Sequence, residues 1–334
     1  MEQTGAPKVI IIDDSHAAAG LARPAPRRHH RAAMNAQQKP QAAARALTFD
    51  FTRPLGEPSL VPPDSVQWRV FRNPIALGVG GVAAVLLEFA DPRIRTGVWD
   101  HSIYKVDPVG RSKRTGVAAM AGVYGPASAA RRLIAGVTRM HSKVGGTTPD
   151  GRAYQALEAE LLNWVHATAA YGFLHAFCRF VSPLGPAERN RFYAEGRPVA
   201  ELYGVTQTIG SDADFTAMLN SLADGFEPHP INLEFLAIIQ SGKAAPAVPR
   251  FLHRALARGA VAILPPLVRR RLQLGREWDL TLADGLALST AGRLADRVRD
   301  RNSPAWAAAI RQGLPGDFAW LSPARQKQLL AQNT

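Results

Sequence analysis

The sequence predicts an all-α protein whose body is a single large helical domain. Apolar residues recur at the spacing of helix faces through most of the chain, and prolines, glycines and short polar residues bound these stretches. Strand patterns are nearly absent, and no internal repeat is visible. Because 46% of the 334 residues are hydrophobic, the chain can bury a large core.

The first 48 residues differ in composition from the rest of the chain. They are rich in Ala, Arg, Pro and Gln and contain one short apolar run at residues 9–12. Such a segment cannot bury enough apolar surface to fold alone, so we expect a basic tail that is disordered or loosely docked on the helical domain of residues 49–330. His29 and His30 lie in this tail and are expected to be solvated rather than to bind a metal.

The first helices of the body are expected after capping residues. Ser65 precedes a short aromatic segment, and an Asn-Pro pair precedes the apolar run of residues 75–90. Three glycines in this run superficially resemble a dinucleotide-binding loop, but no clear strand precedes them and no acidic residue follows in a βαβ context. We therefore expect these glycines to permit close packing of helices. Asp91-Pro92 then ends the run, and a short helix follows.

The Asp-Pro pair at residues 107–108 predicts a helix that continues to about residue 124. Arg111, Arg114 and Thr115 share one face of this helix because they are three and four residues apart. The neighbouring glycines and alanines have small side chains, so a flat ligand could approach the helix backbone while the arginines bind carboxylates of that ligand. A solvated basic face is an equally good interpretation of the same spacing.

The stretch of residues 126–146 predicts a helix with a histidine in its buried face. It begins at a proline and ends at a glycine pair. A buried imidazole needs a partner for its ring nitrogens, which can be a carbonyl, a carboxylate or a metal. Ordinary hydrogen bonding is the more frequent case, and metal ligation is the alternative. The residues of the expected buried face are Ala130, Leu133, Ile134, Val137, Met140, His141 and Val144.

A loop at residues 147–152 and a long helix over about residues 153–180 are expected next. This helix is apolar nearly all round and therefore belongs in the centre of the domain. His166 and His175 lie on it and are expected to be buried, with hydrogen bonding as their default role. Proline and glycine breaks then separate further helices, at about residues 186–203, 212–222, 232–241, 250–264, 266–274, 280–298 and 303–312.

Composition and motifs exclude several classes of function. Cys178 is the only cysteine, so neither an intrachain disulfide nor a cysteine metal site is expected. The net charge of +13 comes without a nucleic-acid motif, which predicts no specific nucleic-acid partner and only weak attraction to anionic membrane surfaces or nucleic acid. The Gly-x-Ser-x-Gly and His-Glu-x-x-His motifs of hydrolases are missing. Without a transmembrane-length apolar run or a signal peptide, we expect a cytoplasmic protein.

Several short motifs follow one another in a characteristic order between about residues 68 and 312. They are Leu86-Leu87-Glu88-Phe89-Ala90-Asp91-Pro92, Gly97-Val98 with His101-Ser102, Asp107-Pro108 with Arg111 and Thr115, Met140-His141 with Val144, Trp164-Val165-His166-Ala167-Thr168, and Pro265-Pro266 with Leu274-Gly275. Each motif is weak alone. Their order and spacing resemble the bacterial domain shared by latex clearing protein (rubber oxygenase) and the oxygenase MpaB.

This resemblance implies an all-helical fold with a globin-like core that holds haem b, and a histidine as the proximal iron ligand. By correspondence, His141 is that ligand, and Arg111 and Thr115 are distal or haem-carboxylate contacts. Where latex clearing protein has a lysine that can cap the iron, this chain has Arg114, which is always protonated and a poor iron ligand. Asp91 stands where the family motif has a histidine before the proline.

The residues and the resemblance together predict a haem b-dependent oxygenase or oxidoreductase that uses dioxygen on an apolar substrate, for example an isoprenoid. Arg111, Arg114 and Thr115 are then the candidate catalytic residues, and His141 is the candidate ligand of the haem iron. His166 is expected to support this site from a greater distance.

Two other functions stay open at this point. The chain could be a non-catalytic helical carrier or sensor of haem or lipid, or a basic membrane-surface protein whose buried histidines are only structural. The sequence also leaves the oligomeric state open, and it leaves any catalytic base open among Glu88, Asp100 and His101.

Overall fold

The computed structural model describes residues 49–102, 107–246 and 248–332, and the basic tail predicted for residues 1–48 lies outside them. The described residues are mostly helical, which confirms the predicted all-α class. In chain order the elements are α1(Val66–Phe71), α2(Pro74–Glu88), α3(Pro92–His101), α4(Pro108–Tyr124), α5(Ala127–His141), β1(Gly145–Thr147), β2(Ala153–Gln155), α6(Ala159–Phe180), α7(Pro186–Glu195), α8(Arg197–Leu202), α9(Asp212–Leu222), η2(Ala223–Gly225), α10(Pro230–Gln240), α11(Arg250–Ala262), α12(Pro266–Arg271), η3(Arg276–Trp278), α13(Leu282–Arg297), α14(Pro304–Arg311), η4(Phe318–Trp320) and α15(Pro323–Gln332).

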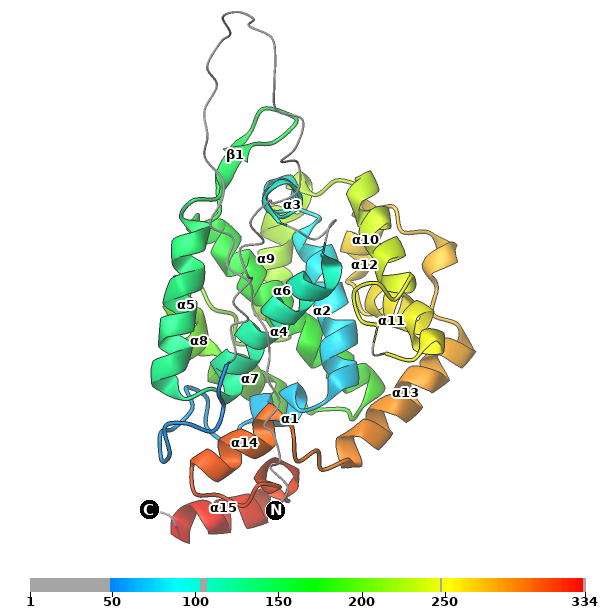
Figure 1. Ribbon diagram of the computed structural model, residues 1–334. Coiled ribbons are helices and arrows are strands. Elements are labelled where there is room, and N and C mark those ends of the chain that lie inside the picture. The colour runs from blue at the N-terminus through cyan, green and yellow to red at the C-terminus, as the bar shows by residue number, and fades with distance from the viewer. Residues whose placement is uncertain (1–48, 103–106, 247, 333–334) are drawn as a thin grey trace, which may run out of the picture.

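The centre of the fold is the pair formed by α2 and α6 (Figure 1). Their backbones touch at two glycines, because a Cβ atom added to Gly172 would lie 2.4 Å from the carbonyl oxygen of Gly80. Trp164 of α6 is fully buried, and its indole nitrogen donates a hydrogen bond of 3.2 Å to the carbonyl of Leu87. The expectation that glycines in this run serve close helix packing is therefore confirmed at Gly80.

The other helices surround this pair. α11 packs against α2, α10 and α13 on one side, whereas α5 lies on the other side and α4 crosses in front of the pair (Figure 1). α14 and α15 lie beyond α1 at the lower end in that view. Among the described residues no single helix is long and apolar enough to span a membrane; α2 and α3 meet that criterion only as a pair, bent by 112°.

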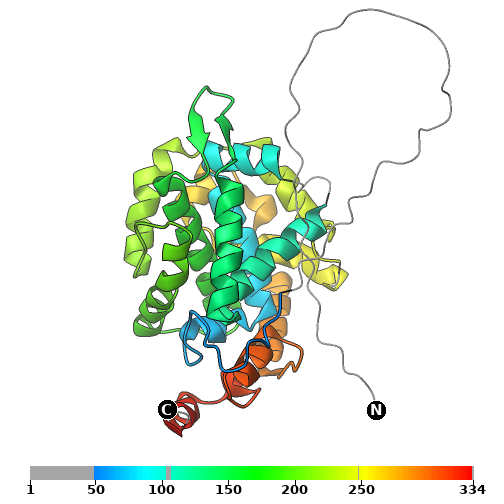
Figure 2. The ribbon, with the colours of Figure 1, turned by 60° about the vertical axis from the view of Figure 1, so that its left-hand side comes forward.

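α4 and α5 form a helical hairpin that opens away from its turn. Asp107 caps α4 by accepting a hydrogen bond of 2.8 Å from the backbone nitrogen of Gly110, as the Asp-Pro pair predicted. The two helices meet at Gly125 and Pro126 and then diverge, so that the first turn of α4 and the last turn of α5 lie at the open end (Figure 2). α2 ends near this opening (Figure 1).

A buried arginine ties three segments together at the closed end of the hairpin. The guanidinium of Arg311, at the end of α14, donates hydrogen bonds to the carbonyls of Phe51 at 2.7 Å, Glu57 at 2.8 Å and Tyr124 at 2.9 Å. It also donates to the hydroxyl of Ser59 at 2.7 Å. The carboxylate of Glu57 in turn accepts hydrogen bonds from the backbone and the hydroxyl of Ser128 in the first turn of α5. The start of the described chain is thereby fixed to α14 and to the α4–α5 turn.

Several predicted boundaries are wrong, and most of them lie around α5 and α6. α5 ends at His141 rather than at the glycine pair, because residues 145–147 form β1, which pairs with β2 in an antiparallel hairpin. α6 consequently begins at Ala159, six residues later than expected. The helix predicted over residues 186–203 is interrupted at Gly196 and forms α7 and α8. α15 was not predicted at all, and its residues are all at least partly exposed.

Candidate functional site

The predicted catalytic residues lie in the first half of α4. Arg111 and Thr115 are one turn apart, and the Arg111 guanidinium donates a hydrogen bond to the Thr115 hydroxyl. That hydroxyl donates back to the carbonyl of Arg111 at 3.2 Å. The pair therefore forms a cationic, hydroxyl-bearing unit at the open end of the hairpin, in which Thr115 is exposed.

His141 is the last residue of α5 and is half-buried. Its pKa is lowered from the usual value, first by burial and then by the positive charge of Arg111. The ring is therefore neutral at pH 7, with a lone pair available on one nitrogen. No described residue forms a hydrogen bond with this ring.

The apolar face of α5 is only partly covered by the described residues. Ala130 and Ile134 are buried, whereas Leu133 and Val137 are half-buried, and Val144, which was expected on this face, lies beyond the end of α5. Met140 was expected in the buried face but is 52% exposed, which is a correction; at the last turn of α5 the inward side is occupied by His141 instead. The face that carries His141 therefore keeps accessible apolar surface next to the imidazole.

Glu88 is the third ionisable group at this end of the fold. It is the last residue of α2, and burial raises its pKa to about 7 against the opposing effect of the Arg111 charge. The Thr168 hydroxyl of α6 lies 3.4 Å from a Glu88 carboxylate oxygen and 2.8 Å from the carbonyl of Val165. We call Glu88, Arg111, Thr115, His141 and Thr168 the Arg111 cluster, because the Arg111 charge acts on both Glu88 and His141.

Arg114 contributes an unsatisfied cation beside this cluster. It lies on α4 one turn after Arg111, and its Nη1 atom is buried with no hydrogen-bond partner among the described residues. A buried guanidinium nitrogen without an acceptor is costly, and native proteins supply a partner in the great majority of cases. An anionic group of a ligand would satisfy it.

His166 is not joined to the Arg111 cluster by any hydrogen bond or ion pair of the described residues. Burial alone lowers its pKa to about 4, so the ring is neutral at pH 7. Glu88, His141 and His166 are all only half-buried, although burial shifts the pKa of each. Each of these side chains therefore keeps some accessible surface, while burial disfavours its charged form.

Other residues considered from the sequence lie outside the cluster. His166 and His175 were both expected to be buried, and both are only half-buried; His175 pairs with Asp212 at 3.1 Å because α9 presents that carboxylate to it. Asp100 and His101, two of the three candidate bases, are exposed at the end of α3. Within the described residues, no group of three or more His, Cys, Asp or Glu side chains could hold a metal ion without a cofactor.

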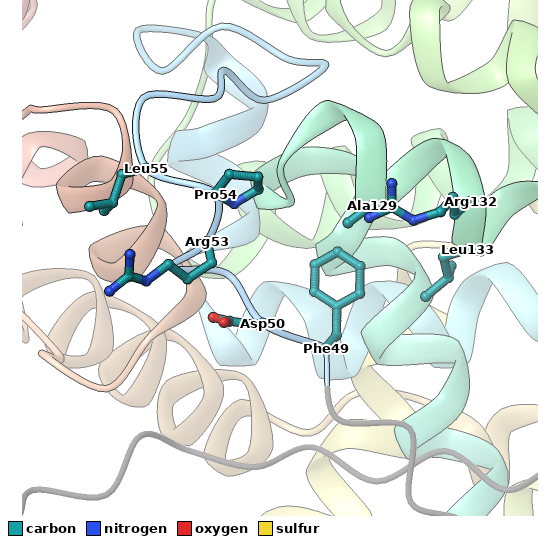
Figure 3. Close-up of a pocket in the computed structure, with 8 residues that line it drawn as sticks. All are labelled: Phe49, Asp50, Arg53, Pro54, Leu55, Ala129, Arg132 and Leu133. Carbon is teal, nitrogen blue, oxygen red and sulfur yellow. The ribbon is translucent and has the colours of Figure 1, made fainter.

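A surface pocket of about 640 Å³ lies towards the other end of α5. Figure 3 shows its lining, which comes from the chain before α1 and from the first half of α5: Phe49, Asp50, Arg53, Pro54, Leu55, Ala129, Arg132 and Leu133. No member of the Arg111 cluster lines it. We therefore do not place the candidate site there.

The raised pKa of Glu88 predicts an unusual pH dependence of stability. The ordinary pKa of this carboxyl is 4.5, and its folded value is about 7, so the folded chain keeps a proton that the unfolded chain loses between these values. Its contribution to stability is therefore present below about pH 4.5 and is lost as the pH rises to about 7. Relative to Glu88→Gln, the free energy of unfolding of the wild type should fall by about 1 to 3 kcal/mol across this window.

Denaturant titrations of both proteins at several pH values measure this difference. The comparison with the variant is needed because His166, whose pKa is lowered, changes stability in the opposite direction between about pH 4 and 6.5. Glu234→Gln, which removes an exposed carboxyl on α10, should follow the wild-type profile. A wild type and a Glu88→Gln variant with parallel profiles would contradict the buried environment of Glu88.

The sequence analysis selected Arg111, Thr115 and His141 as candidates, named Thr168 only within a family motif and left Glu88 as one of three possible bases. A usable signal was present, since Glu88 is the single charged residue in the apolar run of residues 75–90. A lone carboxylate in such a run is rarely buried without a specific role or partner. Thr168 carried only the weaker signal of its place in the motif of residues 164–168, because a threonine in a helix is ordinary.

Comparison with known proteins identifies the family. The family model for the catalytic domain of ER-bound oxygenase mpaB/B'/Rubber oxygenase matches residues 68–297, which is more than half of the chain. The searches of curated proteins and of solved structures gave no match. The matched segment contains the whole Arg111 cluster and confirms the resemblance seen in the order of motifs. The chain therefore belongs to the oxygenase family of mpaB/B' and rubber oxygenase catalytic domains.

Proposed function

We propose that this protein is a haem b-dependent oxygenase that uses dioxygen to oxidise an apolar small molecule, with His141 as the protein ligand of the iron. Membership of an oxygenase family supports the reaction class. The observation that carries the cofactor is the neutral His141 ring, which lacks a hydrogen-bond partner among the described residues and faces the charge of Arg111.

The residues of the site fit haem b. A single imidazole suffices as protein ligand when the remaining donors come from a porphyrin, and neutral imidazole is a common axial ligand of haem iron. The two porphyrin carboxylates need cations, which Arg111 and Arg114 offer on one face of α4. The unpartnered Nη1 of Arg114 supports this pairing, because a carboxylate there would supply its missing acceptor. Apolar surface on α5 beside His141 suits the flat ring.

The individual residues would have distinct roles. When bound, haem supplies an iron at which dioxygen is activated. The lowered pKa of His141 keeps its lone pair free for ligation at neutral pH. Arg111 holds the Thr115 hydroxyl in place, so that a cation and a hydroxyl are offered together to a developing negative charge. Arg114 is always protonated and therefore binds anions instead of capping the iron.

Glu88 is the candidate for holding or moving a proton. A carboxyl with a pKa of about 7 is present in both protonation states at neutral pH, which is the condition for general acid-base catalysis. The Thr168 hydroxyl beside one Glu88 oxygen favours a fixed orientation of that carboxyl. Of the three bases left open by the sequence, Glu88 alone belongs to the Arg111 cluster, whereas Asp100 and His101 are exposed.

An apolar substrate is proposed because the surface next to the cluster is apolar. Val137 on α5 keeps accessible surface on the same side as His141, and Val165 on α6 is exposed one turn before Thr168. Aliphatic side chains around a small set of polar groups are typical of sites for apolar ligands. The polar groups fix the orientation of the substrate, and the aliphatic groups provide binding affinity for it.

The proposal is tested by titrating the purified full-length chain with haemin. We expect a Soret band that saturates at one haemin per chain, shifts on reduction with dithionite, and is accompanied by dioxygen consumption when a polyprenoid is added. A protein that remains colourless would overturn the haem proposal. Saturable haemin binding without dioxygen consumption on any apolar substrate would favour the alternative function, a haem or lipid carrier.

A further inference from the structure

We propose that one helix face, separate from the Arg111 cluster, docks this protein on an anionic membrane surface. The α13 outer face consists of Leu282, Leu286, Arg293, Leu294 and Arg297, which point away from the core. α13 lies along the lower right edge of the molecule in Figure 1. The proposal goes beyond the oxygenase reaction and does not depend on haem.

The apolar side chains of this face are unusually exposed. Leu282 is 95% exposed, Leu286 is 69% exposed and Leu294 is 56% exposed. The opposite side of the helix is the packed one, where Leu288 is buried and Gly292 lies against the backbone of Phe180 in α6. Three large aliphatic side chains on one helix face, all left in water, have a free-energy cost that a soluble surface normally avoids.

The acidic side chains of α13 face inwards, whereas its basic side chains face outwards. Both of its acidic residues turn inwards and are neutralised, Asp284 by Arg258 at 2.9 Å and Asp296 by Arg72 at 3.0 Å. On the outer side, Arg293 and Arg297 are exposed, and neither forms an ion pair with a described residue. The α13 outer face is therefore apolar and positively charged, with no acidic group to offset the arginines.

This combination fits the interface of a bilayer. A helix that lies flat on a membrane inserts its aliphatic side chains among the acyl chains and places its arginines at the level of the lipid phosphates. Leu282 and Leu294 are twelve residues apart, which corresponds to roughly 18 Å along the helix, so the contact would be extended rather than a single point. The net charge of +13 adds a general attraction to anionic lipids.

A second copy of this chain is a less suitable occupant of the same face. A two-fold contact between two α13 outer faces would bring Arg293 and Arg297 of one copy close to those of the other without an acidic residue between them. Like charges in a contact that excludes water are destabilising. Lipid phosphates provide the opposite charge and leave the leucines a hydrocarbon environment.

The test uses the full-length chain and vesicles of phosphatidylglycerol and phosphatidylcholine in equal amounts, with binding measured by co-sedimentation. The variant Leu282→Ser/Leu286→Ser/Leu294→Ser should bind these vesicles at least about 10-fold more weakly than the wild type. The matched control, Leu55→Ser/Leu233→Ser/Ile310→Ser, removes three exposed aliphatic side chains elsewhere on the surface and should bind like the wild type. Circular dichroism should be the same for all three proteins, because every changed residue is exposed.

A second pair of variants tests the charges. Arg293→Gln/Arg297→Gln should weaken binding roughly 30-fold at low salt, and the loss should disappear on pure phosphatidylcholine. Arg270→Gln/Arg276→Gln removes the same charge from exposed arginines outside α13 and should have a clearly smaller effect. Equal binding of the α13 variants and their controls would overturn the proposal. So would a leucine variant that leaves vesicle binding intact and converts a dimer to a monomer in light scattering, because the face would then join two copies.

Discussion

Replacing His141 by alanine is expected to abolish the Soret band of the haemin-loaded protein or to weaken haemin binding by at least about 100-fold. The imidazole offers a nitrogen lone pair to iron, and its lowered pKa keeps that lone pair available at pH 7. Spectrophotometric titration with haemin measures both the amplitude of the band and the dissociation constant. Added imidazole should restore part of the band by entering the space left by the side chain.

The same substitution separates ligation from a structural role. Since the His141 ring is half-buried and has no hydrogen bond with a described residue, its removal should change the free energy of unfolding of the haem-free protein by less than about 1 kcal/mol. His101→Ala removes an exposed histidine at the end of α3 and should bind haemin like the wild type. An unchanged Soret band in His141→Ala, or a large loss of haem-free stability, would contradict the assignment of His141 as ligand.

Replacing Arg311 by leucine is expected to destabilise the fold by about 3 to 5 kcal/mol, the largest effect on stability that we predict for a single substitution. Three backbone carbonyls and one hydroxyl would lose their donor, and these acceptors belong to segments far apart in sequence. Burial lowers the pKa of Arg311 to about 10, so the group is still charged at pH 7 and the hydrogen bonds are charge-assisted. Urea denaturation measures the change.

Two further variants define what Arg311 contributes. Arg311→Lys retains the charge but cannot reach four acceptors with one ammonium group, so its stability should lie between those of the wild type and Arg311→Leu. Arg325→Leu removes an arginine that is exposed on α15 and should change stability by at most about 0.5 kcal/mol. If Arg311→Leu were as stable as Arg325→Leu, the hydrogen bonds that hold residues 49–59 to α14 would contribute no measurable stability.

The helices and their caps could be predicted well from the sequence, because these depend on neighbouring residues. Asn73 and Asp107 cap α2 and α4 where the Asn-Pro and Asp-Pro pairs indicated. The predictions failed where a tertiary contact competes with local preference, as in the β1–β2 hairpin. There Tyr154 is buried against Gly97 of α3, and this packing holds residues 153–155 as a strand although they precede an apolar helix.

The candidate site was predictable in part. Arg111, Thr115 and His141 follow from periodicity and from the family's motifs, since each position is defined by its place on one helix. Glu88 and Thr168 stand in the family's motifs, but the contact between their side chains was not predictable, because it depends on how the end of α2 meets α4 and α6. Within the described residues, the His141 ring has no hydrogen-bonding partner. This is likewise a property of the fold, and helical periodicity in the sequence does not predict it.

The sequence by itself determined the all-α class, the family, and the faces on which the arginines and His141 lie, because helical spacing and motif order are written along the chain. Only the tertiary structure decided which charges meet. The pKa of Glu88 depends on burial by helices distant in sequence and on the approach of Arg111. The exposed leucines of α13 look like core residues in the sequence, and they are surface residues because Leu288 and Gly292 occupy the packed side of that helix.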